Sequence, residues 1–194
     1  MTTTIEKIPT IKIKSNIAKP SQKTGIKVKA ADLDALRDAL SRFKHWGEYD
    51  AGADAGYKNK SDKQIVEVTL TAKPVIQMPV WQGYSKASKD DKKAWDDMYA
   101  KLAKHEMNHH YLSLEVYAKF FMEIDVKNSE IEALNKKLEK ESDEKKRDAL
   151  MKKYTPMTVA LMKTRLAQLS KDLQAAQDIY DTKSDHGKKE GVKI

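Results

Sequence analysis

The chain of 194 residues contains no cysteine. This absence excludes disulfide bonds, a cysteine nucleophile and every zinc site that uses thiolate ligands. Any metal ion must therefore be held by histidine, aspartate or glutamate side chains. The sequence has five histidines, which limits the number of candidate sites.

Long apolar runs are also missing. No segment approaches the roughly 20 apolar residues that a membrane-spanning helix needs, so we expect no membrane span. The N-terminal residues lack the apolar segment of a cleavable signal peptide.

Arginine is scarce, although the formal net charge is +8. Arg37, Arg42, Arg147 and Arg165 are the arginines among 37 basic residues. Because arginine makes most bidentate contacts with bases, we expect no specific nucleic-acid partner. The many lysines predict a solvated surface that attracts anionic polymers in a salt-sensitive way.

The hydrophobic pattern predicts an α+β fold, with a small N-terminal sheet and one helix followed by a long helical part. Residues 1–9 resemble a disordered leader, and residues 10–190 are expected to form a single domain. The expected N-terminal elements are strands at 11–14, 26–28 and 64–72, an extended piece at 75–78, a helix at 31–44 and a loop at 45–63.

Helix-forming residues dominate from Ser88 onward. Ser88 is the expected N-cap of a helix that runs to about residue 124. Charged residues at 129–153 predict a second helix, and apolar residues from Val159 to near Tyr180 predict a third. We expect residues 129–173 to form a charged antiparallel helical hairpin.

Residues 105–109 read His105-Glu106-Met107-Asn108-His109, which is the HExxH pattern. Positions i and i+4 of a helix lie about 40° apart around its axis, so both imidazoles can reach one zinc ion. Both histidines also fall on the apolar side of the predicted helix. Glu106 lies about 100° from His105, where it can take a proton from a zinc-activated water as general base.

A catalytic zinc site usually has a third protein ligand. Glu115 is excluded because it lies about 80° from His105 and about 120° from His109 on the same helix. His186 is our first choice, since an antiparallel final helix could return it to the motif. His45 is the second choice, in a loop flanked by glycine.

Two further residues near the C-terminus are site candidates. Tyr180 could stabilise the oxyanion that forms when water attacks a peptide bond, or it could simply cap the helical core. Asp181 could orient a ligating imidazole through a hydrogen bond, or it could simply lie in a turn.

These residues resemble a bacterial family of predicted secreted zinc-dependent proteases, long catalogued as a domain of unknown function. The similarity spans residues 10–190 and rests on HEMNH at 105–109, on Met-Pro-Val-Trp at 78–81 and on the segment from Tyr to His-Gly at 180–187. The resemblance implies an HExxH zinc peptidase with His186 as a candidate ligand.

The sequence thus predicts a metallopeptidase that binds one zinc ion and hydrolyses peptide bonds. Expected partners are a protein or peptide substrate and, for an exported protease or effector, secretion machinery or a cognate inhibitor. We expect export by a route without a visible N-terminal signal peptide, and a cytoplasmic location before export. The alternatives are a non-enzymatic basic helical binding module, in which the metal motif is accidental or structural, and another zinc hydrolase such as an amidase.

Overall fold

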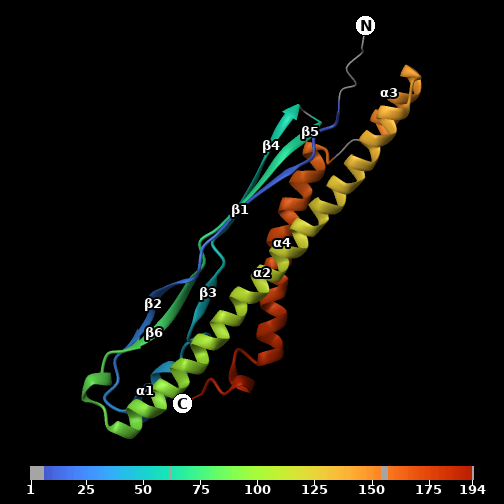
Figure 1. Cartoon of the computed structure of the whole chain (residues 1–194). Helices are drawn as coiled ribbons and strands as arrows, with labels where there is room; N and C mark the ends of the chain where they lie inside the picture. Colours follow the sequence, from blue (N-terminus) through green and yellow to red (C-terminus); the bar gives the residue numbers. More distant parts are fainter. Residues whose placement is uncertain (1–6, 62, 154–156, 194) are drawn as a thin grey trace. The chain divides into compact units, whose positions relative to one another are not determined.

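The computed structural model describes residues 7–61, 63–153 and 157–193. Strands dominate the N-terminal part of the chain and long helices follow, as Figure 1 shows. The predicted α+β class is therefore confirmed. In chain order the elements are β1 (Lys12–Ile17), β2 (Ser21–Val28), α1 (Leu33–Leu40), β3 (Glu48–Asp50), β4 (Ala53–Ser61), β5 (Gln64–Ala72), β6 (Val75–Trp81), η1 (Tyr84–Lys86), α2 (Lys89–Lys140), α3 (Glu144–Lys153), α4 (Val159–Ser184) and η2 (Lys188–Glu190).

The chain forms two compact units, each assembled from three segments. The first unit comprises Met1–Asn16, Asp54–Thr71 and Val116–Lys171, and the second comprises Ile17–Ala53, Ala72–Glu115 and Asp172–Ile194. Helices α2 and α4 each contribute residues to both units. The single domain expected for residues 10–190 stays a prediction.

The first unit contains a three-stranded sheet in the order β1-β5-β4. The strand predicted at 64–72 is confirmed as β5. The prediction of a loop at 45–63 is wrong, because β3 and β4 lie there. Most β4 residues are exposed, so its sequence lacks the apolar alternation that marks a half-buried strand. Pairing with β5 makes this segment a strand.

The apolar core of the first unit joins the N-terminal segment to α2. Ile8 is buried among Ile131, Leu134 and Leu138. The backbone N–H of Ile8 also donates to the Asn135 side chain at 3.0 Å, and the Asn135 amide donates back to the Ile8 carbonyl at 2.9 Å. The leader predicted at 1–9 is thus ordered at Ile8, while residues 1–6 lie outside the described part of the chain.

Helix α2 is continuous, whereas the sequence predicted a break between residues 124 and 129. The Ser129 hydroxyl donates to the Asp125 carbonyl within the helix at 3.1 Å. The Asn128 side chain bonds to both the N–H and the C=O of Ile11, at 2.7 and 2.9 Å. Polar side chains that often end helices therefore find partners here without interrupting the helix.

The second unit contains a three-stranded sheet in the order β2-β6-β3. Strand β2 pairs in parallel with β6, and β3 pairs antiparallel to it. Helix α1 is shorter than the predicted 31–44, because Asp32 caps its N-terminus at the backbone N–H of Ala35 and the helix ends at Leu40.

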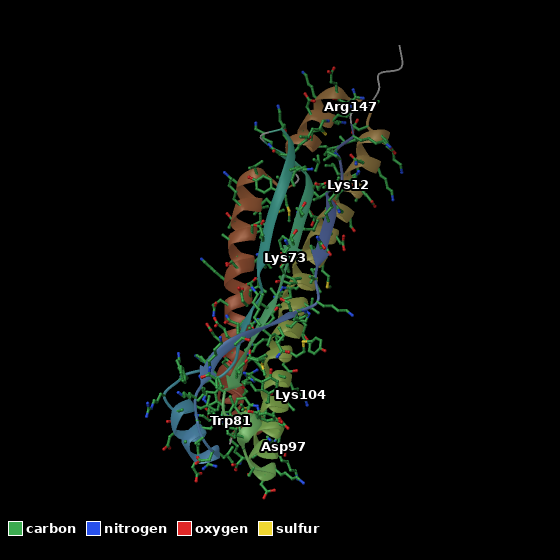
Figure 2. All side chains as sticks on the ribbon, turned by 90° about the vertical axis from the view of Figure 1, so that its left-hand side faces the viewer. Lys12, Lys73, Trp81, Asp97, Lys104 and Arg147 are labelled. Atoms are coloured by element: carbon green, nitrogen blue, oxygen red, sulfur yellow. The ribbon has the colours of Figure 1, made fainter. Side chains whose placement is uncertain are left out.

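Aromatic residues fill much of the second unit's core. Trp81 and Trp95 are buried with ring centroids 5.9 Å apart, and the Trp81 indole N–H donates to the Ala30 carbonyl at 2.9 Å. Figure 2 labels Trp81 near the part of α2 that carries Asp97 and Lys104. The core residues are Val28, Ala30, Leu36, Leu40, Met78, Trp81, Trp95, Met98, Leu102 and Val192.

In the second unit, α2 and α4 lie side by side (Figure 1). His105 of α2 contacts Asp181 of α4, and His109 contacts Gln177. The helices are therefore antiparallel here, and α3 lies between them in the chain. The helical hairpin expected at 129–173 stays a prediction. Within the described ranges, no helix is both long enough and apolar enough to cross a membrane.

Candidate metal centre

The HExxH residues lie on the part of α2 that belongs to the second unit. His105, Glu106 and His109 are buried, with 3%, 4% and 5% of their surfaces exposed. The Nε2 atoms of the two histidines lie 3.3 Å apart. The structure therefore brings the two imidazoles together on an inward face, as their helical spacing predicts.

Helix α4 adds a carboxylate to this pair. The Oδ1 atom of Asp181 lies 3.3 Å from His105 Nε2 and 3.1 Å from His109 Nε2. Among the residues that the structure describes, these three side chains form the group of ligand types that could hold a metal ion. The antiparallel packing of α4 on α2 positions the third member.

Each imidazole has a hydrogen-bond partner on the side that faces away from the other histidine. His105 Nδ1 lies 2.9 Å from Glu190 Oε2, and His109 Nδ1 contacts Gln177 Oε1. The Gln177 amide NH₂ is held by the Ser113 hydroxyl at 3.1 Å, so its oxygen faces His109. Because carboxylate and amide oxygens only accept, both Nδ1 atoms must donate. In the neutral rings, both Nε2 atoms then carry lone pairs.

Three acceptor atoms consequently converge on one point. The two Nε2 atoms lie 3.3 Å apart, and Asp181 Oδ1 lies 3.3 and 3.1 Å from them. These distances can be compared with those between the ligand atoms of a tetrahedral zinc site. With ligands about 2.0–2.1 Å from the zinc, tetrahedral geometry places neighbouring ligand atoms about 3.3–3.4 Å apart. The nature and spacing of the donors therefore fit a zinc ion.

The Glu106 carboxyl group lies inside the same site. Burial raises its pKa to about 8, and the nearby carboxylates of Asp181 and Glu48 act in the same direction. Its side chain occupies space that only glycine at position 47 leaves open, since a Cβ there would lie 2.5 Å from Glu106 Oε1. Gly47 therefore allows the carboxylate to pack against this backbone.

Tyr180 lies against both histidines. Its ring stacks on His105, with centroids 5.0 Å apart, and meets His109 edge-on at 4.8 Å. The hydroxyl accepts a hydrogen bond from the Asn108 amide and donates one to Glu190 Oε1, each at 2.7 Å. Burial, followed by the bond to Glu190, raises the pKa of the phenol. Tyr180 is thus placed at the site with its hydroxyl proton directed to Glu190.

Glu190 is kept charged by these contacts. Burial disfavours its ionised form, but hydrogen bonds from Tyr180 and His105 hold the pKa of the carboxyl below its usual range. Sequence reasoning did not single out this residue.

His186 lies next to the three-residue group but is not one of its members. Its Nδ1 is 3.7 Å from Asp181 Oδ2, and its ring meets His45 edge-on at 4.8 Å. Asp185 and His186 have positive φ values of 52° and 50°, so the chain turns sharply after α4. The structure thus places Asp181 where the sequence analysis expected His186, and His45 likewise stays outside the group.

A cleft of about 950 Å³ opens over the site within the second unit. His105, Glu106, His109 and Asp181 all line it, and β3 contributes Tyr49. The Tyr49 ring stacks on His109 with centroids 6.2 Å apart. Sequence reasoning missed Tyr49 because it treated 45–63 as a loop, and it missed Gly47 because the packing of Glu106 against position 47 has no local signal.

Neither the curated proteins nor the solved structures gave a match to this chain. A family model, in contrast, matches most of its length, including HExxH and the segment that carries Asp181. The chain belongs to the family described as Bacterial protein of unknown function (DUF922), whose model matches residues 24–187.

Proposed function

We propose that the protein is a zinc-dependent metallopeptidase that holds one zinc ion through His105, His109 and Asp181. The observation that carries this proposal is the convergence of two imidazole Nε2 atoms and one carboxylate oxygen, 3.1–3.3 Å apart. Three acceptors without a shared proton repel one another, and a cation at their centre reverses that repulsion. Three protein ligands also leave the fourth zinc position to water or substrate, as in catalytic zinc sites.

Asp181 replaces His186 as the proposed third ligand. Asp181 Oδ1 contacts both Nε2 atoms, whereas His186 contacts only the other oxygen of Asp181, at 3.7 Å. His186 and His45 are assigned to the cleft wall, where they can contact a substrate.

Glu106 is the proposed general base. When bound, zinc would polarise a substrate carbonyl and lower the pKa of an adjacent water molecule. The Glu106 carboxylate lines the same cleft, where it can accept a proton from the attacking water and later give it to the leaving amine.

The volume and the lining of the cleft are compatible with a peptide substrate. Its volume of about 950 Å³ lies at the upper end of the roughly 300–1,000 Å³ typical of ligand pockets. It is lined by apolar groups such as Phe43 and Trp46 and by lysines such as Lys44 and Lys188, which can bind the side chains and carbonyls of an extended segment. The resemblance to predicted zinc-dependent proteases points the same way.

The test combines metal content with peptide hydrolysis. The purified protein should contain about one zinc per chain by elemental analysis and should cleave members of a quenched-fluorescent peptide library. Glu106→Gln should keep the zinc and lose about 10²–10⁴-fold in turnover, because glutamine cannot accept a proton. Glu115→Gln, an exposed change on the same helix, is the matched control and should match the wild type.

The outcomes separate the competing functions. Absence of stoichiometric zinc after purification in zinc-containing buffer would reject the metal site and favour the basic binding module. Zinc without hydrolysis of any peptide would leave a metal-binding module or another hydrolase. Near-normal turnover of Glu106→Gln would show that Glu106 is not the base.

A further inference from the structure

We propose that Glu190 is a positioning residue that fixes the tautomer and orientation of His105, and that Tyr180 and Asn108 hold Glu190 in place for this role. The inference rests on the proposed zinc site. It also changes the part assigned to Tyr180, from an oxyanion donor to a support for the metal centre.

The contacts form one chain of hydrogen bonds. The Asn108 amide donates to the Tyr180 hydroxyl at 2.7 Å, and that hydroxyl donates to Glu190 Oε1 at 2.7 Å. The other carboxylate oxygen, Oε2, accepts from His105 Nδ1 at 2.9 Å. Both oxygens of Glu190 are therefore engaged, one by the tyrosine and the other by the metal-binding imidazole.

The backbone that carries Glu190 is itself fixed. It forms the short helix η2 between Gly187 and Gly191, which both have φ values of 83°. Such values favour glycine. The N–H groups of Glu190 and Val192 both donate to the Gly187 carbonyl, at 2.9 and 3.1 Å. Val192 is 4% exposed and belongs to the core of the second unit.

This segment packs directly against the metal-binding residue. A Cβ at Gly187 would lie 2.8 Å from Val192 Cγ2 and 3.3 Å from His105 Cγ. Gly187 thus lies close to the buried His105 side chain, which is 3% exposed. The buried Val192 anchors the segment that carries Glu190, whose Oε2 lies 2.9 Å from His105 Nδ1.

The chemical consequence concerns the His105 tautomer. A proton held on Nδ1 by Glu190 leaves the Nε2 lone pair free for the metal, and a carboxylate partner also makes the imidazole a stronger donor. Loss of such a supporting hydrogen bond typically lowers metal affinity by about 10–100-fold. Glu190 lies beyond residues 24–187, the part of the chain that the family model matches.

Three variants test the hydrogen-bond chain in the full-length protein. Glu190→Ala removes both acceptors, Glu190→Gln keeps an oxygen but removes the charge, and Tyr180→Phe keeps the ring stack but removes the hydroxyl. Glu132→Gln, an exposed change in the first unit, is the control. Zinc affinity is measured by competition with a chromophoric chelator, and circular dichroism checks that each variant folds.

A spectroscopic measurement on the metal-free proteins separates positioning from general stability. Imidazole ¹⁵N spectra at pH 8, with His105 assigned by comparison with His105→Ala, report which ring nitrogen carries the proton. The wild type should show His105 protonated at Nδ1. Glu190→Ala should shift the population toward the Nε2-protonated form, whereas the control should not.

The expected result is a loss of zinc affinity of about 10–100-fold in Glu190→Ala, with smaller losses in Glu190→Gln and Tyr180→Phe. Zinc binding that is equal in the wild type and Glu190→Ala, or an unchanged His105 tautomer in a folded Glu190→Ala protein, would overturn the inference. Wild-type protein that binds no zinc would instead refute the proposed function. The tautomer measurement would then still decide the role of Glu190.

Discussion

Asp181 and His186 stand five positions apart near the end of α4, and the structure separates their roles. We predict that Asp181→Ala lowers the zinc affinity by more than about 10–100-fold, because it removes a ligand atom. A loss of about 10–100-fold is typical when only a hydrogen bond to a ligand residue is removed. His186→Ala should keep stoichiometric zinc, since its nearest contact to the group is the other Asp181 oxygen at 3.7 Å. Elemental analysis after dialysis against a weak chelator measures both.

Asp178→Ala is the matched control for that pair. Asp178 lies on the same helix and lines the same cleft, but it belongs to a hydrogen bond with Gln174 and not to the ligand group. Metal loss in His186→Ala, together with normal zinc content in Asp181→Ala, would restore His186 as the third ligand.

At the residue scale, sequence reasoning succeeds where spacing is local. His105 and His109 could be found because helical geometry alone brings i and i+4 together. The position of Asp181 next to these histidines could not be found in this way. It requires the register of α4 against α2, which depends on packing between segments far apart in the chain. A local signal did exist: Gln177 and Asp181 share the same i, i+4 spacing, and Gln177 contacts His109 while Asp181 contacts both histidines.

At the scale of the element, β5 illustrates how pairing explains a buried charge. Glu67 on this central strand is 9% exposed, and its two oxygens contact Lys14 of β1 at 2.7 Å and Lys58 of β4 at 3.2 Å. The hydrogen bond from Lys14, supported by Lys58, holds the pKa of Glu67 below its ordinary value of 4.5. The two neighbouring strands thus satisfy this carboxylate on both sides.

We predict that Glu67→Gln weakens the first unit at pH 7 but not in acid. A carboxyl with a lowered folded-state pKa stabilises the fold above its unfolded pKa, here 4.5, and loses this contribution as the pH falls through the folded-state value. The urea midpoint of Glu67→Gln, followed by circular dichroism, should therefore lie below that of the wild type at pH 7 and approach it near pH 3.

Asp148→Asn provides the comparison for that measurement, because Asp148 is an exposed carboxylate of α3 in the same unit. Its midpoint should follow the wild type at both pH values. A gap between Glu67→Gln and the wild type that persists unchanged at pH 3 would contradict an electrostatic origin.

The same contrast between local pattern and pairing decides which elements the sequence predicts. β5 alternates buried and less buried residues and is found at once, whereas β4 is a strand because β5 pairs with it. Helix α2 has no proline or glycine between Lys89 and Lys140, so nothing obliges it to break. The polar residues between 125 and 129 predict a helix end when the sequence is read alone. In the structure, Asn128 bonds to Ile11 and Ser129 bonds to the Asp125 carbonyl, so the helix continues.

At the scale of the whole molecule, successive segments of the chain belong alternately to the first and the second unit. Each unit takes one segment from the N-terminal, middle and C-terminal parts of the chain, and the family match at 24–187 includes residues of both. Because such division depends on long-range contacts, composition and periodicity did not reveal it. The proposed zinc site, however, draws all its ligands and supports from the second unit.

This division gives a prediction about stability. Trp46, Trp81 and Trp95 all belong to the second unit, so tryptophan fluorescence reports its unfolding. A metal that binds only the folded site adds about 2.7 kcal/mol when its free concentration is 100 times its dissociation constant. Zinc should therefore raise the unfolding midpoint seen by fluorescence, and His105→Ala should abolish that shift. A zinc-induced shift of the same size in His105→Ala would place the binding site elsewhere in the chain.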